Sequence, residues 1–318
     1  MCGIVGYIGA RPCADILLGG LERLEYRGYD SAGLAVFDGD DTQVLRSVGK
    51  LVNLAGQLRE QPLKGTLGIG HTRWATHGRP SEENAHPHTA GPVTVVHNGI
   101  VENHMALRAE LESRGHTFRS ETDTEIFSHF IREKLDGGLD LEGAVRAAIS
   151  SVHGSYAIAV LSTTEPDKIV VAKNASPLVI GLGEGETFLA SDIPALLSHT
   201  RRVVFMQEGE LAVLTRDGMH LTDLSGSTIE RNPRTITWTP SQAEKGGYKH
   251  FMLKEIHEQP RAMTDTLRGR ISLETGEVHL EDVTLDDAAV RNITRIIVCA
   301  CGTAWHAGLV GRDRKSVV

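Results

Sequence analysis

Residues 1–9 read MCGIVGYIG, a short apolar strand that begins directly behind a cysteine at position 2. Removal of the initiator methionine is expected when the second residue is small, and it would leave Cys2 as the N-terminal residue. Its thiol and a free α-amine have ordinary pKa values of about 8.5 and about 7.7–8.0. Such an amine can serve as the base that activates a nucleophile. Cys2 is therefore a candidate nucleophile, although cysteine is also commonly a small buried hydrophobe.

Beyond this strand, the apolar pattern predicts one mixed α and β block over the first 225 residues. Amphipathic helices are expected at residues 14–25, 51–60, 103–114, 124–135 and 141–152. Apolar runs predict strands at residues 3–9, 34–37, 44–47, 67–72, 93–98, 156–161, 169–172, 178–180, 187–190, 203–206 and 211–214. A single parallel sheet would need a helix after nearly every strand, so two sheets with helices outside them fit this order better.

The composition is typical of a soluble globular protein. The 318 residues, 40% of them hydrophobic and 23% charged, suggest about two domains. A net charge of -8 disfavours a nucleic acid partner. No apolar run approaches the ~20 residues needed to cross a membrane, and the first residues lack the basic segment of a signal peptide. Four cysteines do not make a disulfide scaffold, so we expect a cytoplasmic protein.

A change of composition predicts the domain organisation. Residues 232–247 read NPRTITWTPSQAEKGG, with two prolines and no clear period, which favours a linker. We therefore expect a first domain over residues 1–225, a linker over 226–248 and a second unit over 249–318. In the second unit the pattern predicts a helix at 251–267, a strand at 296–299 and the start of a helix after residue 303.

Three segments dense in polar residues adjoin the predicted buried strands: residues 71–78 (HTRWATHG), 97–99 (HNG) and 120–125 (SETDTE). The planar guanidinium of Arg73 suits a carboxylate, although it could equally form a surface ion pair. Trp74 could be a lid or part of a core.

Two of these segments also offer groups that suit catalysis or the binding of a charged substrate. The side chain of Asn98 and the backbone N–H of Gly99 could face a developing oxyanion, although Asn-Gly is also the commonest tight-turn dipeptide. Asp123 could accept hydrogen bonds from an ammonium group, and it equally suits the start of a helix.

Neither a metal nor a phosphate loop is indicated. The spacings of the histidines at positions 71, 77, 86, 88 and 97 match no usual metal-ligand pattern. Cys299 and Cys301 would share one face of a strand, which favours a buried strand end over metal or redox chemistry. Residues 181–186 (GLGEGE) are followed by no helix, so they predict a hairpin turn.

Taken together, these strings closely resemble the glutaminase domain of the glutamine–fructose-6-phosphate aminotransferase family. The match covers MCGIVG at residues 1–6, LEYRGYDSAG at 24–33 and the three polar segments, in the same order through about 225 residues. Residues 252–260 (MLKEIHEQP) resemble the start of the family's second half. Residues 301–303 (CGT) resemble the first sugar-phosphate loop of its isomerase domain.

The resemblance implies a fold and an activity. The fold is an α+β, four-layer αββα N-terminal-nucleophile hydrolase, or class II glutamine amidotransferase, domain, followed by an incomplete α/β sugar isomerase segment. L-Glutamine is hydrolysed in the first domain, and the ammonia converts fructose 6-phosphate into glucosamine 6-phosphate in the second. No cofactor or metal is implied, and the full-length protein is expected to be a homodimer.

The resemblance also implies residue roles. Cys2 attacks the glutamine amide with its own amine as base, and Asn98 and Gly99 form the oxyanion hole. Arg73 binds the α-carboxylate and Asp123 the α-ammonium. It further places Thr76 and His77 in the same pocket, Trp74 in a loop that closes over glutamine, and Thr303 in a remnant of the sugar-phosphate site.

The sequence departs from the family pattern in its second half, because only the opening segment of the isomerase domain is present. Residues 311–318 turn basic where the family has an apolar helix, and we hypothesise that this end is artefactual. Ala304 stands where many members have serine. We therefore expect at most glutamine hydrolysis from this chain. The alternatives are another Cys2 amidotransferase, such as amidophosphoribosyltransferase, and a fragment that binds glutamine without turnover.

Overall fold

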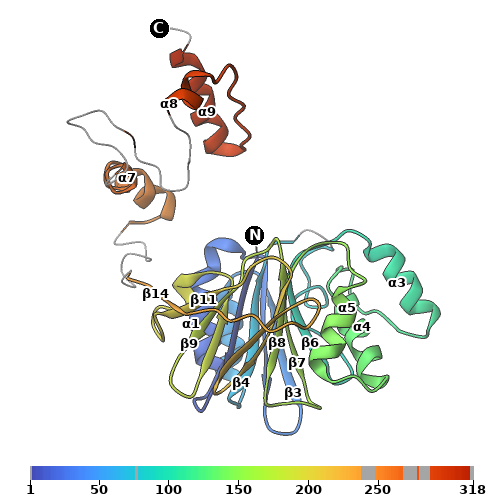
Figure 1. Cartoon of the computed structure of the whole chain (residues 1–318). Helices are drawn as coiled ribbons and strands as arrows, with labels where there is room; N and C mark the ends of the chain where they lie inside the picture. The colour runs from blue at the N-terminus through green and yellow to red at the C-terminus, as the bar shows by residue number, and fades with distance from the viewer. Residues whose placement is uncertain (1, 76–77, 238–247, 268–277, 279–286, 316–318) are drawn as a thin grey trace. The chain divides into compact units, whose positions relative to one another are not determined.

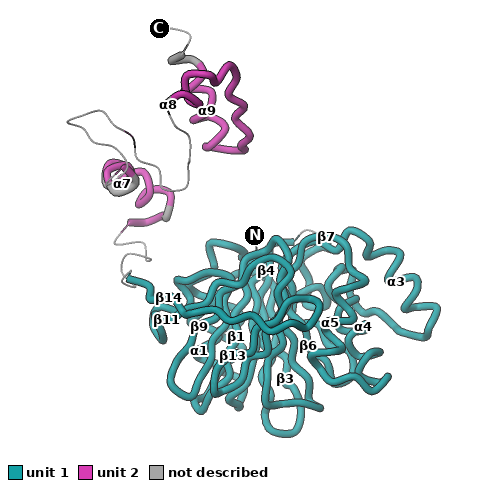
Figure 2. The backbone as a smooth tube through the Cα atoms, viewed as in Figure 1, with its two compact units in different colours: residues 1–246 teal, residues 247–318 magenta. Residues whose placement is uncertain are grey.

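The computed structural model describes residues 2–75, 78–237, 248–267, 278 and 287–315. The chain divides into two units, residues 1–246 and residues 247–318, which Figure 2 shows in different colours. Unit 1 holds every described candidate site residue except Thr303, which belongs to unit 2.

Unit 1 is built on two sheets in which every strand pair is antiparallel. The eight-stranded sheet has the order β14-β11-β9-β10-β1-β4-β2-β3. Its strands are β1 (Gly3–Ile8), β2 (Ser31–Phe37), β3 (Thr42–Val48), β4 (Leu67–Arg73), β9 (Val179–Leu182), β10 (Thr187–Ala190), β11 (Arg202–Phe205) and β14 (Arg234–Thr235). The six-stranded sheet has the order β13-β12-β8-β7-β6-β5. Its strands are β5 (His88–Ala90), β6 (Val93–Val101), β7 (Gly154–Ser162), β8 (Ile169–Asn174), β12 (Glu210–Thr215) and β13 (Gly218–Asp223).

Five helices cover the outer faces of these sheets (Figure 1). They are α1 (Ala14–Leu24), α2 (Leu51–Glu60), α3 (His104–Ser113), α4 (Glu125–Asp136) and α5 (Leu141–Ile149). Apolar residues of α1 and α2 form one core with the eight-stranded sheet, and those of α3, α4 and α5 form another with the six-stranded sheet. A third core lies between the two sheets. Two short 3-10 helices, Glu25–Arg27 and Ile193–Ala195, complete the unit.

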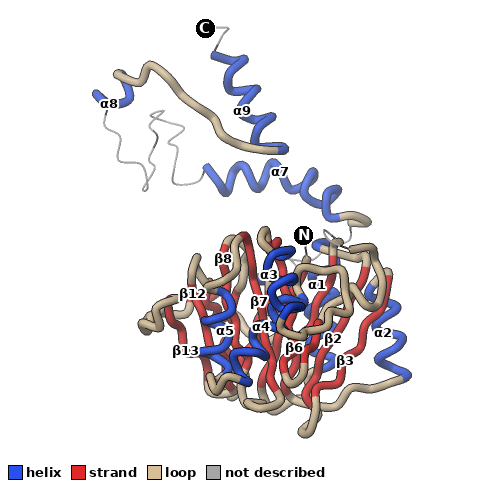
Figure 3. The backbone as a smooth tube through the Cα atoms, turned by 90° about the vertical axis from the view of Figure 1, so that its right-hand side faces the viewer, coloured by secondary structure: helices blue, strands red, loops and turns tan. Residues whose placement is uncertain are grey.

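The period of two along each strand produces these layers. In β1, Val5 and Tyr7 pack under the helices, whereas Ile4 and Ile8 belong to the core between the sheets. Successive side chains of a strand point to opposite faces, so a strand buried on both sides is apolar throughout. The four-layer αββα architecture expected from the resemblance is thus confirmed (Figure 3).

Most predicted elements of unit 1 are confirmed, with boundaries shifted by a few residues. The predicted turn over residues 181–186 joins β9 and β10 as a hairpin, in which Leu182 pairs with Thr187. The short strands β5, β13 and β14 were not predicted, because each offers too few apolar residues to show a period.

The structure adds detail to the expected linker over residues 226–248. Within this range, β14 pairs with β11 through Arg202 and Thr235 and becomes the edge of the sheet, and Thr228 forms a bridge with Thr222. Both contacts use backbone groups, so a polar sequence rich in proline did not reveal them. The described part of this range up to residue 237 therefore continues unit 1.

Unit 2 contains α7 (Phe251–Leu267), α8 (Asp287–Arg291) and α9 (Gly302–Lys315). The helix expected at 251–267 is confirmed, and the helix expected after residue 303 begins slightly earlier, at Gly302, so that Thr303 is helical. The strand predicted at residues 296–299 is wrong: no described strand pairs with it, and a strand needs a partner for its backbone groups. In the described parts of both units, no helix has the length and apolar character required to traverse a bilayer.

Candidate active site

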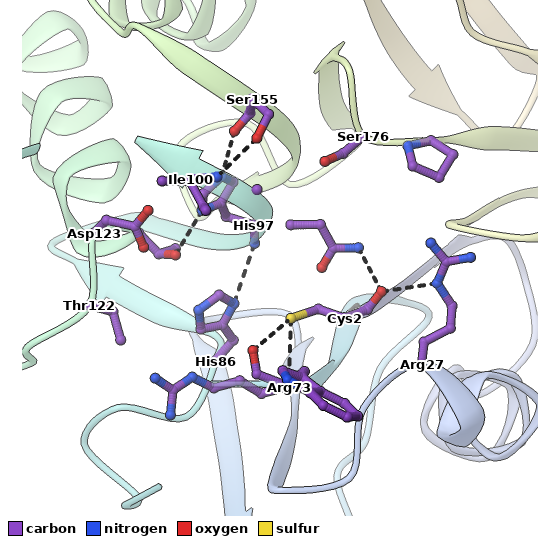
Figure 4. Close-up of a pocket in the computed structure, with 15 residues that line it drawn as sticks. Cys2, Arg27, Arg73, His86, His97, Ile100, Thr122, Asp123, Ser155 and Ser176 are labelled. Atoms are coloured by element: carbon purple, nitrogen blue, oxygen red, sulfur yellow. Dashed lines mark hydrogen bonds between the residues drawn. The ribbon is translucent and has the colours of Figure 1, made fainter. Parts of the chain in front are cut away.

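The thiol of Cys2 lies against a backbone segment that follows β4. Strand β1 pairs with β4, which brings the residue before β1 next to Trp74. The Trp74 amide donates a hydrogen bond to Sγ at 3.2 Å, and the thiol donates to the Trp74 carbonyl at 3.5 Å (Figure 4). Burial raises the pKa of the Cys2 thiol, and the Trp74 amide opposes this only in part. The group is therefore a neutral thiol at physiological pH, and its attack on a substrate needs a base.

The backbone of Cys2 is fixed by two side-chain donors. Its carbonyl oxygen accepts hydrogen bonds from Arg27 Nε and from Asn98 Nδ2, both at 3.1 Å. The Arg27 guanidinium is buried, and its Nη1 forms an ion pair of 3.2 Å with Asp192 Oδ2. Tyr26 donates a hydrogen bond of 2.5 Å to the same carboxylate oxygen. These hydrogen bonds hold the backbone of Cys2, directly before β1, in one conformation.

The segment that contacts the thiol is itself held by Asp30. The backbone N–H of Asp30 donates to the Arg73 carbonyl at 3.1 Å, and its carboxylate accepts from the Ala75 amide. Gly28 allows the backbone just before Asp30 to lie close to the backbone of Arg73, because a Cβ at position 28 would lie 2.7 Å from the Arg73 carbonyl carbon. Asp30 therefore braces the peptide groups on both sides of Trp74.

Asn98 and Gly99 lie in β6, and both line a cavity that Cys2 also lines. Asn98 Nδ2 donates to Ser191 Oγ at 2.9 Å as well as to Cys2. Gly99 has a φ of 142°, a conformation that residues with side chains avoid, and a Cβ there would lie 2.0 Å from the Ser155 carbonyl oxygen. The sequence pair Asn-Gly is thus part of a strand rather than the tight turn that we considered as its alternative.

Arg73 and Asp123 bring one positive and one negative group to this cavity, and both are at least 96% buried. Arg73 Nη2 donates to the Gly78 carbonyl at 3.1 Å, and Nη1 lies 4.0 Å from Asp30 Oδ1. Asp123 Oδ2 accepts a hydrogen bond of 2.8 Å from the Val101 amide. Neither is the surface ion pair or simple helix cap that we weighed as an alternative.

These groups line one cavity of about 230 Å³ (Figure 4). Its walls are formed by Cys2, Arg27, Arg73, Trp74, His86, His97, Asn98, Gly99, Ile100, Thr122, Asp123, Thr124, Ser155, Ser176 and Pro177. They come from segments far apart in the sequence, which the two sheets bring to one end of unit 1. A zwitterion that carries an amide would find a thiol, amide donors and both charges here.

The remaining candidate residues lie in different parts of the chain, and not all of them are among the described residues. The Trp74 ring is 47% exposed and packs edge-on against Tyr29, so it belongs to the surface rather than to a core. Thr76 and His77 lie outside the described residues. Thr303 is exposed in the first turn of α9 in unit 2.

Sequence reasoning missed several residues of this site. Arg27 and Asp30 stand in the string LEYRGYDSAG, which served only to recognise the family, and its density of charged residues beside an apolar strand was an available signal. Ser176 and Ser191 carry no such signal, because single serines in loops are common. Their contribution depends on the topology alone.

Four buried histidines lie at or near the cavity: His86 and His97 line it, whereas His71 and His88 do not. Burial lowers the pKa of His71 and of His88 to about 3. Across the part of the chain that is described, no three His, Cys, Asp or Glu side chains converge in a way that could hold a metal ion. The rings also contact one another, as with His71 and His86 at 4.0 Å between centroids and His86 and His88 at 4.8 Å.

Comparison with known proteins agrees with this site. Residues 71–198 match a family described as the glutamine amidotransferase domain. A glutamine–fructose-6-phosphate aminotransferase (isomerizing) of Symbiobacterium thermophilum is 58% identical over 98% of this chain and 51% of its own length. The enzymes of that name from Thermus thermophilus and Clostridium tetani are 52% and 51% identical over the same shares. The chain spans about half the length of these curated relatives.

Solved structures give the same fold at lower identity. A glutamine phosphoribosylpyrophosphate amidotransferase from B. subtilis aligns with a TM-score of 0.62 at 26% identity, over 71% of this chain and 50% of its own. A second structure, described as the allosteric regulatory enzyme of purine biosynthesis, gives 0.63 at 27%, over 70% and 49%. This likeness is structural and distant, whereas the likeness to the aminotransferases runs through the whole chain. Unit 1 therefore has the fold of a class II glutamine amidotransferase domain, and nearly the whole chain is similar to about half of a glutamine–fructose-6-phosphate aminotransferase.

Proposed function

We propose that unit 1 hydrolyses the side-chain amide of L-glutamine to glutamate and ammonia, with Cys2 as the nucleophile. One observation carries the proposal: a single cavity is lined by a thiol, an amide donor, a buried guanidinium and a buried carboxylate. Glutamine is a zwitterion with a neutral amide at its far end, so each of its groups meets a complementary one.

In this proposal the two charged side chains position the substrate. Arg73 pairs with the α-carboxylate, and Asp123 accepts hydrogen bonds from the α-ammonium through the oxygen that Val101 does not use. Charge-assisted bonds of this kind are about twice as strong as neutral ones. The family resemblance assigns glutamine binding also to Thr76 and His77, which lie outside the described residues, and places Trp74 in a loop that closes over bound glutamine.

The chemistry needs a base, because the Cys2 thiol is protonated at physiological pH. The α-amine that removal of Met1 would expose fills this role. Sγ bonds to the amide carbon as its proton passes to the amine. The negative charge on the amide oxygen is met by the Gly99 N–H and by Asn98 Nδ2, one of whose two N–H groups exchanges Ser191 Oγ for the oxyanion. The carbon–nitrogen bond then breaks, ammonia leaves with the proton, and water hydrolyses the thioester to glutamate and the free thiol.

The name of the relatives suggests what the ammonia is for. We propose that in a protein of their length it converts fructose 6-phosphate into glucosamine 6-phosphate, with residues 249–318 as the start of an isomerase domain. Thr303 would then contribute to a sugar-phosphate site, and the longer protein would act as a homodimer in the cytoplasm. This chain alone is expected to release glutamate and ammonia only.

Glutamate release by the purified chain tests the proposal, with Cys2→Ala as the control. The expected result is turnover by the parent chain and none by Cys2→Ala, together with an intact mass that lacks the initiator methionine. Equal release by both proteins would refute it. Calorimetry with glutamine separates the alternative, since a pure binding module would bind glutamine and release no glutamate.

A further inference from the structure

The orientation of the Asn98 amide decides what this residue can do. A turn of half a revolution about the last side-chain bond leaves its shape unchanged but exchanges the oxygen with the nitrogen. As the amide stands, Nδ2 donates to the Cys2 carbonyl at 3.1 Å and to Ser191 Oγ at 2.9 Å. The reversed amide would place an oxygen against the Cys2 carbonyl oxygen. Only the first orientation offers N–H groups beside the nucleophile.

His71 contacts the opposite end of this amide. Its Nε2 lies 3.0 Å from Asn98 Oδ1 and 3.1 Å from the His97 carbonyl oxygen. Both of these atoms can only accept a hydrogen bond, so Nε2 carries the proton and donates. The other ring nitrogen, Nδ1, is buried without a hydrogen-bond partner among the described residues, which suits a lone pair better than an N–H. The imidazole is therefore neutral, with its proton facing Asn98.

The His71 ring cannot readily turn away from this contact. It is fully buried, and its strand β4 lies between β1 and β2, where it pairs with Ile4 on one side and Gly33 on the other. The His86 ring packs on it at 4.0 Å between centroids with 32° between the planes. The sheet and the His86 ring thus hold the Nε2–H of His71 in place whether or not a substrate is bound.

We propose that His71 is a positioning residue that locks the Asn98 amide with its N–H groups towards Cys2. It does not line the cavity and touches no substrate. Its role rests on the proposed function, because it matters only if Asn98 stabilises an oxyanion. Without His71 the amide would spend part of its time reversed, and the oxyanion would lose a donor during that time.

His71→Leu and His71→Gln test this role, with kcat and KM for glutamate release as the readout. Loss of one oxyanion donor typically costs about 10²–10³ in kcat, so an amide that is only part-time reversed should cost His71→Leu roughly 10- to 100-fold. KM should stay near that of the parent chain, because the groups that bind the zwitterion are unchanged. Gln carries an N–H donor at the position of Nε2, so His71→Gln should recover most of the loss, whereas His71→Asn, whose amide is shorter, should not.

Two further measurements distinguish positioning from general damage. Alkylation of the Cys2 thiol by iodoacetamide needs no oxyanion hole, so its rate should be the same in His71→Leu as in the parent chain. In an Asn98→Ala background, His71→Leu should cause little additional loss of kcat, since the two residues act as one unit. His88→Leu, which alters an equally buried histidine outside the cavity wall, serves as the matched control and should retain kcat. If His71→Leu does not fold, the contrast between Gln and Asn at position 71 decides the question.

The possible failures are separable. If the parent chain releases no more glutamate than Cys2→Ala, the proposed function fails and this inference fails with it. If the parent chain is active, a normal kcat in His71→Leu, or a loss that adds fully to that of Asn98→Ala, overturns the role of His71 alone. An equal loss of kcat in His88→Leu would also overturn it, because the effect would then be one of packing.

Discussion

The two units of the chain bury their apolar residues to very different extents. In unit 1, strand β6 lies between β5 and β7, and Val95 and Val96 are fully buried on its two faces. In unit 2, Ile296, Ile297 and Val298 form an equally apolar run, and each is more than half exposed. The difference lies in the neighbours, since no strand among the described residues pairs with the second run.

This contrast extends from apolar groups to the chemistry of polar ones. Around the cavity of unit 1, Arg73 at the end of β4 and Asp123 just before α4 are only 3% and 4% exposed, so each charge is desolvated and directed. In unit 2 the candidate residue Thr303 is exposed to water. A polar group gains strength and direction when a sheet shields it from solvent. The packed core of unit 1 therefore gives its polar groups the shielding from solvent that catalysis requires.

The largest expected effect comes from the same change in the two apolar runs. Val96→Asp would bury an unpaired charge between the sheets, at a cost of several kcal/mol against a total stability of about 5–15 kcal/mol. We expect the cooperative melting of unit 1 to be lost. Ile297→Asp places the same charge on a side chain that is 73% exposed. It should change the stability of unit 1 by less than about 0.5 kcal/mol.

Thermal denaturation followed by circular dichroism measures both variants. Glutamate release provides a second readout, because it depends on unit 1. If Ile297→Asp destabilised unit 1 as strongly as Val96→Asp, the contrast between a covered and an uncovered run would be wrong.

A smaller effect is expected at a buried polar group. Asp123→Asn keeps an acceptor for the Val101 amide but removes the charge that faces the substrate ammonium. Hydrogen bonds to charged groups contribute about 1.5–3 kcal/mol, so KM for glutamine should rise by roughly 10- to 150-fold with a smaller change in kcat. Glu121→Gln is the matched control, because this exposed carboxylate lies two residues away and does not line the cavity. An unchanged KM in Asp123→Asn would contradict the assignment of the ammonium site.

Much of the fold could be predicted from the sequence, and the failures share one cause. The helix at 51–60 and the strand around Val95 are specified by local periodicity, which is visible in one segment alone. The short strand β14 and the run at 296–299 depend on whether a partner strand exists, which no local pattern reveals. The first has a partner in β11, and the second has none among the described residues.

The candidate site divides in the same way. Cys2, Asn98 and Asp123 stand in recognisable strings, so family resemblance was sufficient to single them out. Arg27, Ser191 and His71 act through contacts with these residues, and such contacts follow from the pairing of strands rather than from spacing in the sequence. His71 stands in a quoted string, yet only its distance of 3.0 Å to Asn98 gives it a role.

The smallest expected effect concerns the thiols, which also divide between the units. Cys2 is partly buried near Asp30, whose negative charge adds to burial in raising the pKa of the thiol. Asp30→Asn removes this charge but leaves an acceptor for the Ala75 amide, so the segment at Trp74 should stay in place. The thiolate of Cys2 then becomes easier to form, its pKa falls, and its alkylation by iodoacetamide should begin at lower pH. Cys299 and Cys301 are exposed in unit 2 and serve as internal references, since their profiles should not move. Mass spectrometry of the N-terminal peptide and of the peptide that carries Cys299 and Cys301 separates the rate of Cys2 from that of the two references. A profile for Cys2 that stays fixed or moves to higher pH would show that Asp30 acts on the thiol only through the backbone, and not through its charge.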